Sequence, residues 1–473
     1  MATLSMDVPA RLLGVICGAV IVLMPFHALL TVWGASLVGH YTALRLWKEV
    51  VLVLLIVGVV VLLVQRRSAV RAAFMPREWA TRLALVAGAY ALVVILSGLI
   101  AYLAGGVSPK ALVYGLILDL RPVLFFGVAW IVSVYGGGWL YTHWRKLLLI
   151  PAMIVVGFGI LQFFVLPDDF LSHFGYGPTT ISAMQTVDQK ELYHRVQSTL
   201  RGANPFGAYL ILIVSACAAV LIKKLGRGGW KNLLRGSGQD GRSGFRRQVG
   251  LYAAAGAASL GALGLTFSRS AWIGACIALG WMAYVALGPG RVRRGLLLAA
   301  VAFLIAFSGL TYIMRDNDVF QNAFFHTDEH SASHESSNTG HFNATWENLQ
   351  DAASRPWGGG AGTAGPASAY NTGKPAKVAE NYYIQIAQET GLLGLGLFAA
   401  LTVMIGRELW LRRRDALALA LLASLIGLTA TNMFMHSWTD DTIAYIWWGL
   451  AGAALLADRS ERVMSETEKQ GGL

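Results

Sequence analysis

Charged residues are scarce in this chain of 473 residues. Asp, Glu, Lys and Arg make up 14% of it, while 55% of its residues are hydrophobic and its mean hydropathy is positive. A typical soluble domain has about 25% charged residues, so this composition excludes an ordinary soluble protein. The sequence therefore predicts an integral membrane protein.

Cysteine is also rare, and a cleavable leader and internal repeats are not evident. Cys17, Cys217 and Cys276 all fall within apolar stretches, which argues against a disulfide framework and against a cysteine-type metal site. The first apolar stretch has no small-residue cleavage site, so we expect it to be retained as a helix. The two halves of the chain show no convincing self-similarity, which argues against a transporter.

Long apolar stretches are what the chain does have. Twelve of them can cross the ~30 Å hydrocarbon core as helices of about 20 residues. They cover 11–30, 48–65, 81–103, 111–134, 147–166, 204–223, 249–267, 271–288, 295–313, 390–410, 415–435 and 442–457. Because backbone groups in lipid must be satisfied internally, residues 1–473 are predicted to form a single all-α membrane bundle with about 12 transmembrane helices.

Basic residues concentrate in alternate loops, and this accounts for the net charge of +12 without nucleic-acid binding. By the positive-inside rule, these loops and both termini are predicted to be cytoplasmic. The loops contain Arg66 to Arg82, Arg145 and Lys146, Lys223 to Arg247, Arg291 to Arg294, and Arg412 to Arg414. The segment 224–248 is expected to be a flexible basic cytoplasmic loop near anionic lipid headgroups.

The opposite face is predicted to be periplasmic and holds the longest loop, 314–389, between predicted helices 9 and 10. A loop of more than ~15 residues is usually functional. Within it, 341–354 has the pattern of an amphipathic helix, and the glycines of 356–363 predict a tight turn or close approach to a ligand. The same face receives 31–47, 104–110, 167–203, Ser268–Ser270 and the loop around His436–Asp441.

Arginines lie at the predicted outer ends of several spans. Arg195, Arg201 and Arg269 could hold a pyrophosphate with their planar guanidinium groups. The alternative for each arginine is a snorkelling anchor or a structural ion pair. Asp119 and Arg121, inside the fourth span, predict a structural or gating pair.

The order of these motifs resembles the O-antigen ligase and O-antigen polymerase superfamily. Arg201-Gly-x-Asn-Pro precedes a span, Ser268-Arg269-Ser270 joins two spans, and a long outer loop follows. The end of that loop, Glu380-Asn381-Tyr382-Tyr383 through Gly391-Leu-Leu-Gly394, looks like the ending of this loop in the family. The resemblance covers roughly residues 190–410.

One departure from the family pattern concerns the end of the outer loop. Many members have His-Asn where this chain has Glu380-Asn381. The segment from Glu335 to His341 looks like a variant pattern in which the histidine comes earlier. The resemblance thus implies His341 as the general base, with a surface histidine on an amphipathic helix as the alternative.

The resemblance implies an O-antigen ligase in the bacterial inner membrane. Such an enzyme transfers O-antigen polysaccharide from undecaprenyl pyrophosphate to lipid A-core at the periplasmic face, and we expect an inverting, metal-independent reaction without a cofactor. Arg269 and Arg201, assisted by Arg195, are expected to hold the pyrophosphate.

Glu380 is the competing base, or it orients His341 or binds an acceptor sugar. Polar residues at the mouth of a span indicate a site, so we expect Asn381, Tyr382 and Tyr383 to bind substrate.

Other functions remain open at this point. An O-antigen polymerase shares the donor but extends a second lipid-linked chain, and no local motif separates it from a ligase. Metal catalysis would rest on Asp168-Asp169 or Asp440-Asp441, which are adjacent acidic pairs in the predicted outer loops. A lipid-linked sugar transporter and a structural or receptor-like membrane protein explain the outer arginines less well.

Overall fold

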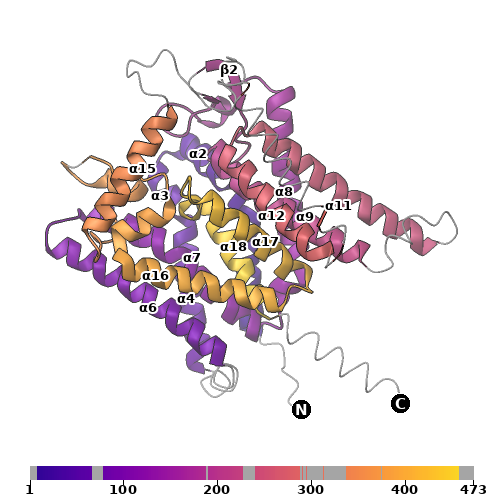
Figure 1. The fold of residues 1–473 in the computed structure, drawn as a ribbon, viewed down its shortest axis with the longest axis horizontal. Coiled ribbons are helices and arrows are strands. Elements are labelled where there is room, and N and C mark those ends of the chain that lie inside the picture. Colours follow the sequence, from indigo (N-terminus) through magenta and orange to yellow (C-terminus); the bar gives the residue numbers. More distant parts are fainter. Residues whose placement is uncertain are drawn as a thin grey trace.

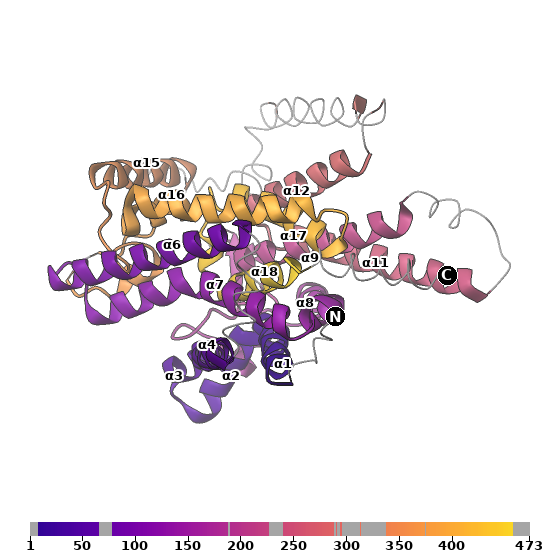
Figure 2. The ribbon, with the colours of Figure 1, turned by 90° about the horizontal axis from the view of Figure 1, so that it is seen from below.

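The structure is a computed structural model, and it describes residues 8–65, 78–187, 190–226, 240–287, 290, 294–295, 313, 337–373 and 375–456. This described part is a bundle of helices with one small two-stranded sheet (Figures 1 and 2). Nine of its helical segments are long and apolar enough to cross a membrane. The predicted all-α polytopic membrane fold is therefore confirmed.

The described helices begin and end as follows. They are α1 (Val8–Leu23), α2 (His27–Val38), α3 (Tyr41–Arg45), α4 (Trp47–Gln65), α6 (Glu78–Leu103), α7 (Pro109–Tyr135), α8 (Trp139–Phe164), α9 (Ala203–Leu225), α11 (Asp240–Leu265), α12 (Arg269–Leu287), α15 (Ser337–Ser354), α16 (Tyr382–Leu411), α17 (Ala416–Thr431) and α18 (Asp441–Ala454). Strands β1 (Gln185–Val187) and β2 (Lys190–Arg195) pair antiparallel, and short 3-10 turns include η1 (Met24–Phe26) and η4 (Gly365–Tyr370).

Most predicted spans correspond to one helix, with a few differences in detail. The span expected at 11–30 is interrupted by η1, where Pro25 lacks the amide hydrogen that would continue α1. Helix α16 begins at Tyr382, where Asn381 caps it, and has a kink at the non-helical Gly391, next to the predicted start of the span 390–410. The segment 224–248 is helical from Asp240 onwards. The predicted span 295–313 falls almost entirely outside the described residues.

The centre of the bundle is formed by short helices that are buried on all sides. All 14 residues of α18 are buried, and α18 packs mainly against α7. Helices α12 and α17 cross where Gly274 meets Gly427, and a Cβ atom on Gly274 would lie 2.2 Å from Thr431 Oγ1. Small residues at a crossing allow the backbones of membrane helices to approach closely.

Side-chain contacts gather the predicted outer segments at one end of the bundle. Ser108, before α7, donates its hydroxyl to the Tyr370 carbonyl, and Asn381 donates to the Met433 carbonyl. Figure 1 shows α2, α3, α15 and β2 on the same side of the molecule. At the other end, Lys223 donates to the Arg413 carbonyl, in agreement with the predicted grouping of basic loops. These two ends are called the outer end and the basic end.

The glycine-rich segment 356–363 packs between α6, α7 and α16. Gly358, Gly360 and Gly362 have positive φ angles, and a Cβ atom on Gly362 would lie 2.3 Å from the Ala111 carbonyl oxygen. The Gly362 amide donates to the buried Glu389 carboxylate at 2.7 Å. Of the two expectations for this segment, the packing supports a tight turn, because its close contacts are made with the chain itself.

Candidate active site

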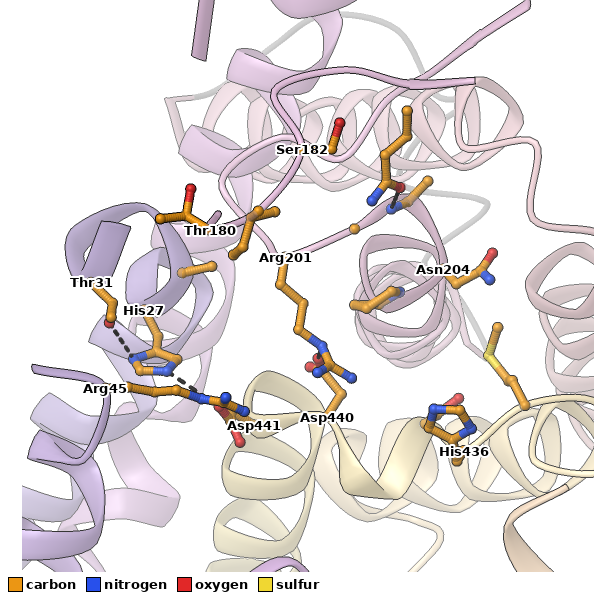
Figure 3. Close-up of a pocket in the computed structure, with 18 of the residues that line it drawn as sticks. His27, Thr31, Arg45, Thr180, Ser182, Arg201, Asn204, His436, Asp440 and Asp441 are labelled. Atoms are coloured by element: carbon orange, nitrogen blue, oxygen red, sulfur yellow. Dashed lines mark hydrogen bonds and ion pairs between the residues drawn. The ribbon is translucent and has the colours of Figure 1, made fainter. Parts of the chain in front are cut away.

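A cavity of about 510 Å³ lies at the outer end of the bundle (Figure 3). Its walls come from segments far apart in the sequence: α2, α3, residues 180–185, the start of α9, and the turn before α18. Figure 3 shows Arg201 between a group containing His27, Arg45 and Asp441 on one side and His436 on the other. The arginines, histidines and carboxylates that line the cavity are His27, Arg45, Arg201, His436, Asp440 and Asp441.

Arg201 is held in this cavity by a carboxylate from the last helix. Its Nε atom lies 3.0 Å from Asp440 Oδ2, and the side chains of Arg201 and Asp440 are 38% and 5% exposed. Asp440 also caps α18, because its carboxylate accepts a hydrogen bond from the Thr442 amide at 3.0 Å. The partner therefore fixes the arginine while leaving part of the guanidinium open to the cavity, where it could bind an anion.

A buried ionic network forms the floor of the cavity and centres on Asp441. The Asp441 carboxylate contacts Arg121, Lys48 Nζ at 3.3 Å and His27 Nε2 at 3.2 Å. Arg121 also donates to the Thr439 carbonyl. Two basic side chains and a histidine around one carboxylate hold the start of α18 against α7, α4 and α2.

Asp119 and Arg121 do not form a direct ion pair, although the charge of Arg121 acts on the Asp119 carboxyl. Residues two positions apart on a helix do not face each other. Arg121 contacts Asp441, whereas the Asp119 carboxyl is buried beside the Glu389 carboxyl. The structural role of Arg121 is therefore to connect α7 with α18.

His436 is a titratable group of the cavity that the sequence reasoning missed. The Ala379 carbonyl accepts a hydrogen bond from its ring, and its Nδ1 atom is buried without a partner among the described residues. Burial and the nearby Arg201 guanidinium lower the pKa of His436 to about 4. Its imidazole is therefore neutral at pH 7, with a nitrogen able to accept a proton.

Arg45 is a second cation that the sequence reasoning did not select. It ends the short helix α3 and lines the cavity near Asp441. Burial opposes its charge, but Asp441 together with Tyr41, Tyr370 and Tyr114 more than compensates, so the pKa of Arg45 is raised. Two guanidinium groups, Arg45 and Arg201, thus line one cavity.

Of the arginines predicted from the sequence, only Arg201 lines this cavity. Arg195 donates from Nε to the Thr266 carbonyl at 3.0 Å and from Nη2 to Asn204 Oδ1 at 2.5 Å. Asn204 is itself in the cavity wall, so Arg195 lies just behind it. Arg269 is the first residue of α12, is partly buried, and is not among the residues that line the cavity.

The predicted residues at the end of the outer loop mostly shape the start of α16. The Asn381 side chain accepts hydrogen bonds from the Tyr383 and Ile384 amides, Tyr382 is buried, and the Tyr383 hydroxyl donates to the Thr429 carbonyl at 3.3 Å. Glu380 is exposed and follows Ala379, the residue that binds the His436 ring.

His341 lies in α15, and its side chain is outside the described residues. Helix α15 confirms the predicted helix, which begins four residues earlier than expected and ends at Ser354, before Pro356.

Comparison with known families identifies the central part of the chain. Residues 254–399 match the family model described as O-antigen ligase. This match supports membership of the chain in the O-antigen ligase and polymerase superfamily. The resemblance read from the motifs is thereby confirmed. A search of curated proteins gives no match.

The part of the chain that matches the O-antigen ligase family runs from α11 into α16. It contains Arg269, His341 and Glu380. Arg45, Arg201 and His436 lie outside it. The cavity is therefore built beside the matched part, from the helices that precede and follow it.

Proposed function

We propose that this superfamily member is an O-antigen ligase whose reaction takes place at the outer-end cavity. It would transfer O-antigen polysaccharide from undecaprenyl pyrophosphate to lipid A-core at the periplasmic face of the inner membrane. The observation that carries the proposal is the partly exposed Arg201 guanidinium, fixed by Asp440 inside the cavity. Its position at the end opposite the basic loops supports a periplasmic site.

The arginines would stabilise the leaving group. In the reaction, an acceptor hydroxyl oxygen attacks the anomeric carbon of the donor sugar, and the bond from this carbon to the pyrophosphate oxygen breaks. Undecaprenyl pyrophosphate departs with the bonding electrons, and inversion at the carbon follows from a single displacement. Arg201 and Arg45 would meet the negative charge that develops, because a planar guanidinium binds phosphate oxygens without a metal.

Arg195 and Arg269 are proposed to take part from outside the cavity. Arg195 fixes Asn204 and the turn before α12, which supports an assisting role. Arg269 begins α12 two residues after that turn and would contact the lipid-linked donor as it approaches.

The hydroxyl proton needs a base, and three residues are proposed for this role. His341 and Glu380 are the candidates from the sequence, and His436 is the candidate from the cavity. His436 is supported by its place in the cavity wall, where its Nδ1 atom has no partner among the described residues. Glu380 could also bind the acceptor sugar. Asn381, Tyr382 and Tyr383 are proposed to support substrate binding, because they fix the segment that carries Glu380.

The test is transfer by the purified full chain, with undecaprenyl pyrophosphate-linked O-antigen and rough lipopolysaccharide in EDTA, and products resolved on a gel. We expect a ladder of capped lipopolysaccharide. Longer lipid-linked chains without capped lipopolysaccharide would show that the protein is a polymerase and not a ligase. Transfer only after a divalent cation is added would contradict the arginine mechanism, and no product from either acceptor would overturn the proposed function.

A further inference from the structure

A second cavity lies at the basic end, away from the proposed transfer site. Its volume is about 1060 Å³, and it is formed by the first turns of α6 and the last turns of α16. It is lined by basic, acidic and apolar side chains together. A cavity of this mixed character at a helix end suits a molecule that has both a charged head and apolar chains.

The charges of this cavity leave an excess of one cation. Three guanidinium groups, from Arg82, Arg407 and Arg412, face the carboxylates of Glu78 and Glu408. Arg412 lies 2.6 Å from Glu408, and both side chains are only 6% exposed, so this pair forms a neutral floor. Arg412 also lies over the Trp79 ring, 5.0 Å from its centre, which fixes the floor to α6.

The two remaining arginines are open to a ligand. Arg407 contacts Glu408 at 2.7 Å, but Glu408 is already neutralised by Arg412, and the Arg407 side chain is 65% exposed. Arg82 pairs with the exposed Glu78 at 3.0 Å and is itself 72% exposed. An exposed ion pair of this kind is weak and gives way readily to a competing anion.

Exposed apolar side chains continue from the arginines along the helix surface. Leu85 and Leu411 line the cavity and are 67% and 56% exposed. Met404 lines it one turn away from Arg407. Acyl chains could therefore lie against the cavity wall while a phosphate contacts the guanidinium groups.

We propose that this cavity binds an anionic phospholipid, with its phosphate at Arg82 and Arg407 and its acyl chains along Leu85 and Leu411. Basic pockets between membrane helices at the cytoplasmic side are suited to anionic headgroups, and each arginine near such a headgroup contributes about fivefold in affinity. Arg82 and Arg407 differ from a solitary snorkelling arginine, because they flank a cavity whose floor is a buried ion pair.

The test is native mass spectrometry of the full chain in detergent, titrated with phosphatidylglycerol, cardiolipin or phosphatidylethanolamine. We expect one preferred anionic lipid per chain and weaker binding of phosphatidylethanolamine. The double substitution Arg82→Gln and Arg407→Gln should lower the affinity at least about tenfold. Leu85→Trp, which fills the apolar wall at an exposed position and keeps every charge, should also weaken binding.

The control is Arg145→Gln, because Arg145 is another exposed arginine at the basic end, on α8, and is not part of this cavity. It should bind the lipid like the unchanged protein. Equal binding of anionic and zwitterionic lipids, or an unchanged affinity in the folded double variant, would overturn the proposal. Soluble glycerol phosphate that competes fully with the lipid would assign the cavity to free phosphates instead.

Discussion

The substitution Arg201→Gln removes the charge that the proposed mechanism needs most. Asp440 is 5% exposed, but it keeps its hydrogen bond to the Thr442 amide at 3.0 Å, so α18 retains its cap. Because the Arg201 side chain is 38% exposed, solvent screens the ion pair, and its loss should reduce the free energy of unfolding by only about 1 kcal/mol. The variant should therefore fold and reach the membrane.

The catalytic effect of Arg201→Gln should be much larger than its effect on stability. Removing one fixed donor that stabilises a developing negative charge typically lowers kcat by about 10²–10³-fold. We expect a loss of this size at saturating donor, and a smaller loss for Arg201→Lys, which keeps the charge without the planar fork. The assay is the initial rate of capped lipopolysaccharide formation by purified protein.

The matched control for this experiment is Arg145→Gln at the basic end, which should leave kcat unchanged. Asp440→Asn should give an intermediate loss, because Arg201 keeps its charge but loses the partner that orients it. The reasoning is refuted if Arg201→Gln is folded and its kcat stays within about twofold of the unchanged protein.

Three further predictions concern the cavity and the helix packing around it. Burial and Arg201 lower the pKa of His436 from 6.5 to about 4. Its contribution to stability is therefore present above pH 6.5 and is lost as the pH falls towards 4. The variant His436→Gln should show a smaller fall of Tm over this pH range. Asp441→Asn should lower stability by about 3–5 kcal/mol, measured by denaturant unfolding, since it uncouples Arg121 from its buried carboxylate. Gly274→Ala should force α12 and α17 apart, which lowers the free energy of unfolding by about 1–3 kcal/mol and therefore lowers Tm.

Each of these three has a result that would contradict it. If Tm falls at low pH in His436→Gln as much as in the unchanged protein, another group causes the acid sensitivity. Wild-type stability of Asp441→Asn would mean that the ionic network contributes little. The control for Gly274→Ala is Gly280→Ala in the same helix, where an added Cβ atom meets no atom within 4 Å. If both alanine variants melt alike, the crossing is not tight.

Hydropathy predicted the helices well because a membrane span needs a long apolar stretch whatever its neighbours are. It placed an end less well where a single residue decides, as at Pro25, which interrupts the first span. It placed the start of the span 390–410 at the kink of α16 but did not show the helical turns that Asn381 caps before it. Helix α18 has 14 residues, fewer than a span normally needs, and all of them are buried.

The site was only partly predictable, since its contacts join distant parts of the chain. Arg201 was recognisable beside the Asn-Pro that opens α9, but its partner Asp440 lies in the turn before α18. His436 and Arg45 were missed because each lies in a short segment with no family motif. His436 could have been selected from its place near Asp440-Asp441 in a predicted outer loop.

The proposed transfer site can be tested directly by determining the structure of the full chain with undecaprenyl pyrophosphate, the proposed leaving group, bound in nanodiscs. The proposal predicts density for the pyrophosphate in the outer-end cavity, in contact with the guanidinium groups of Arg201 and Arg45 and near His436. Pyrophosphate density bound elsewhere on the protein, with this cavity empty, would contradict it.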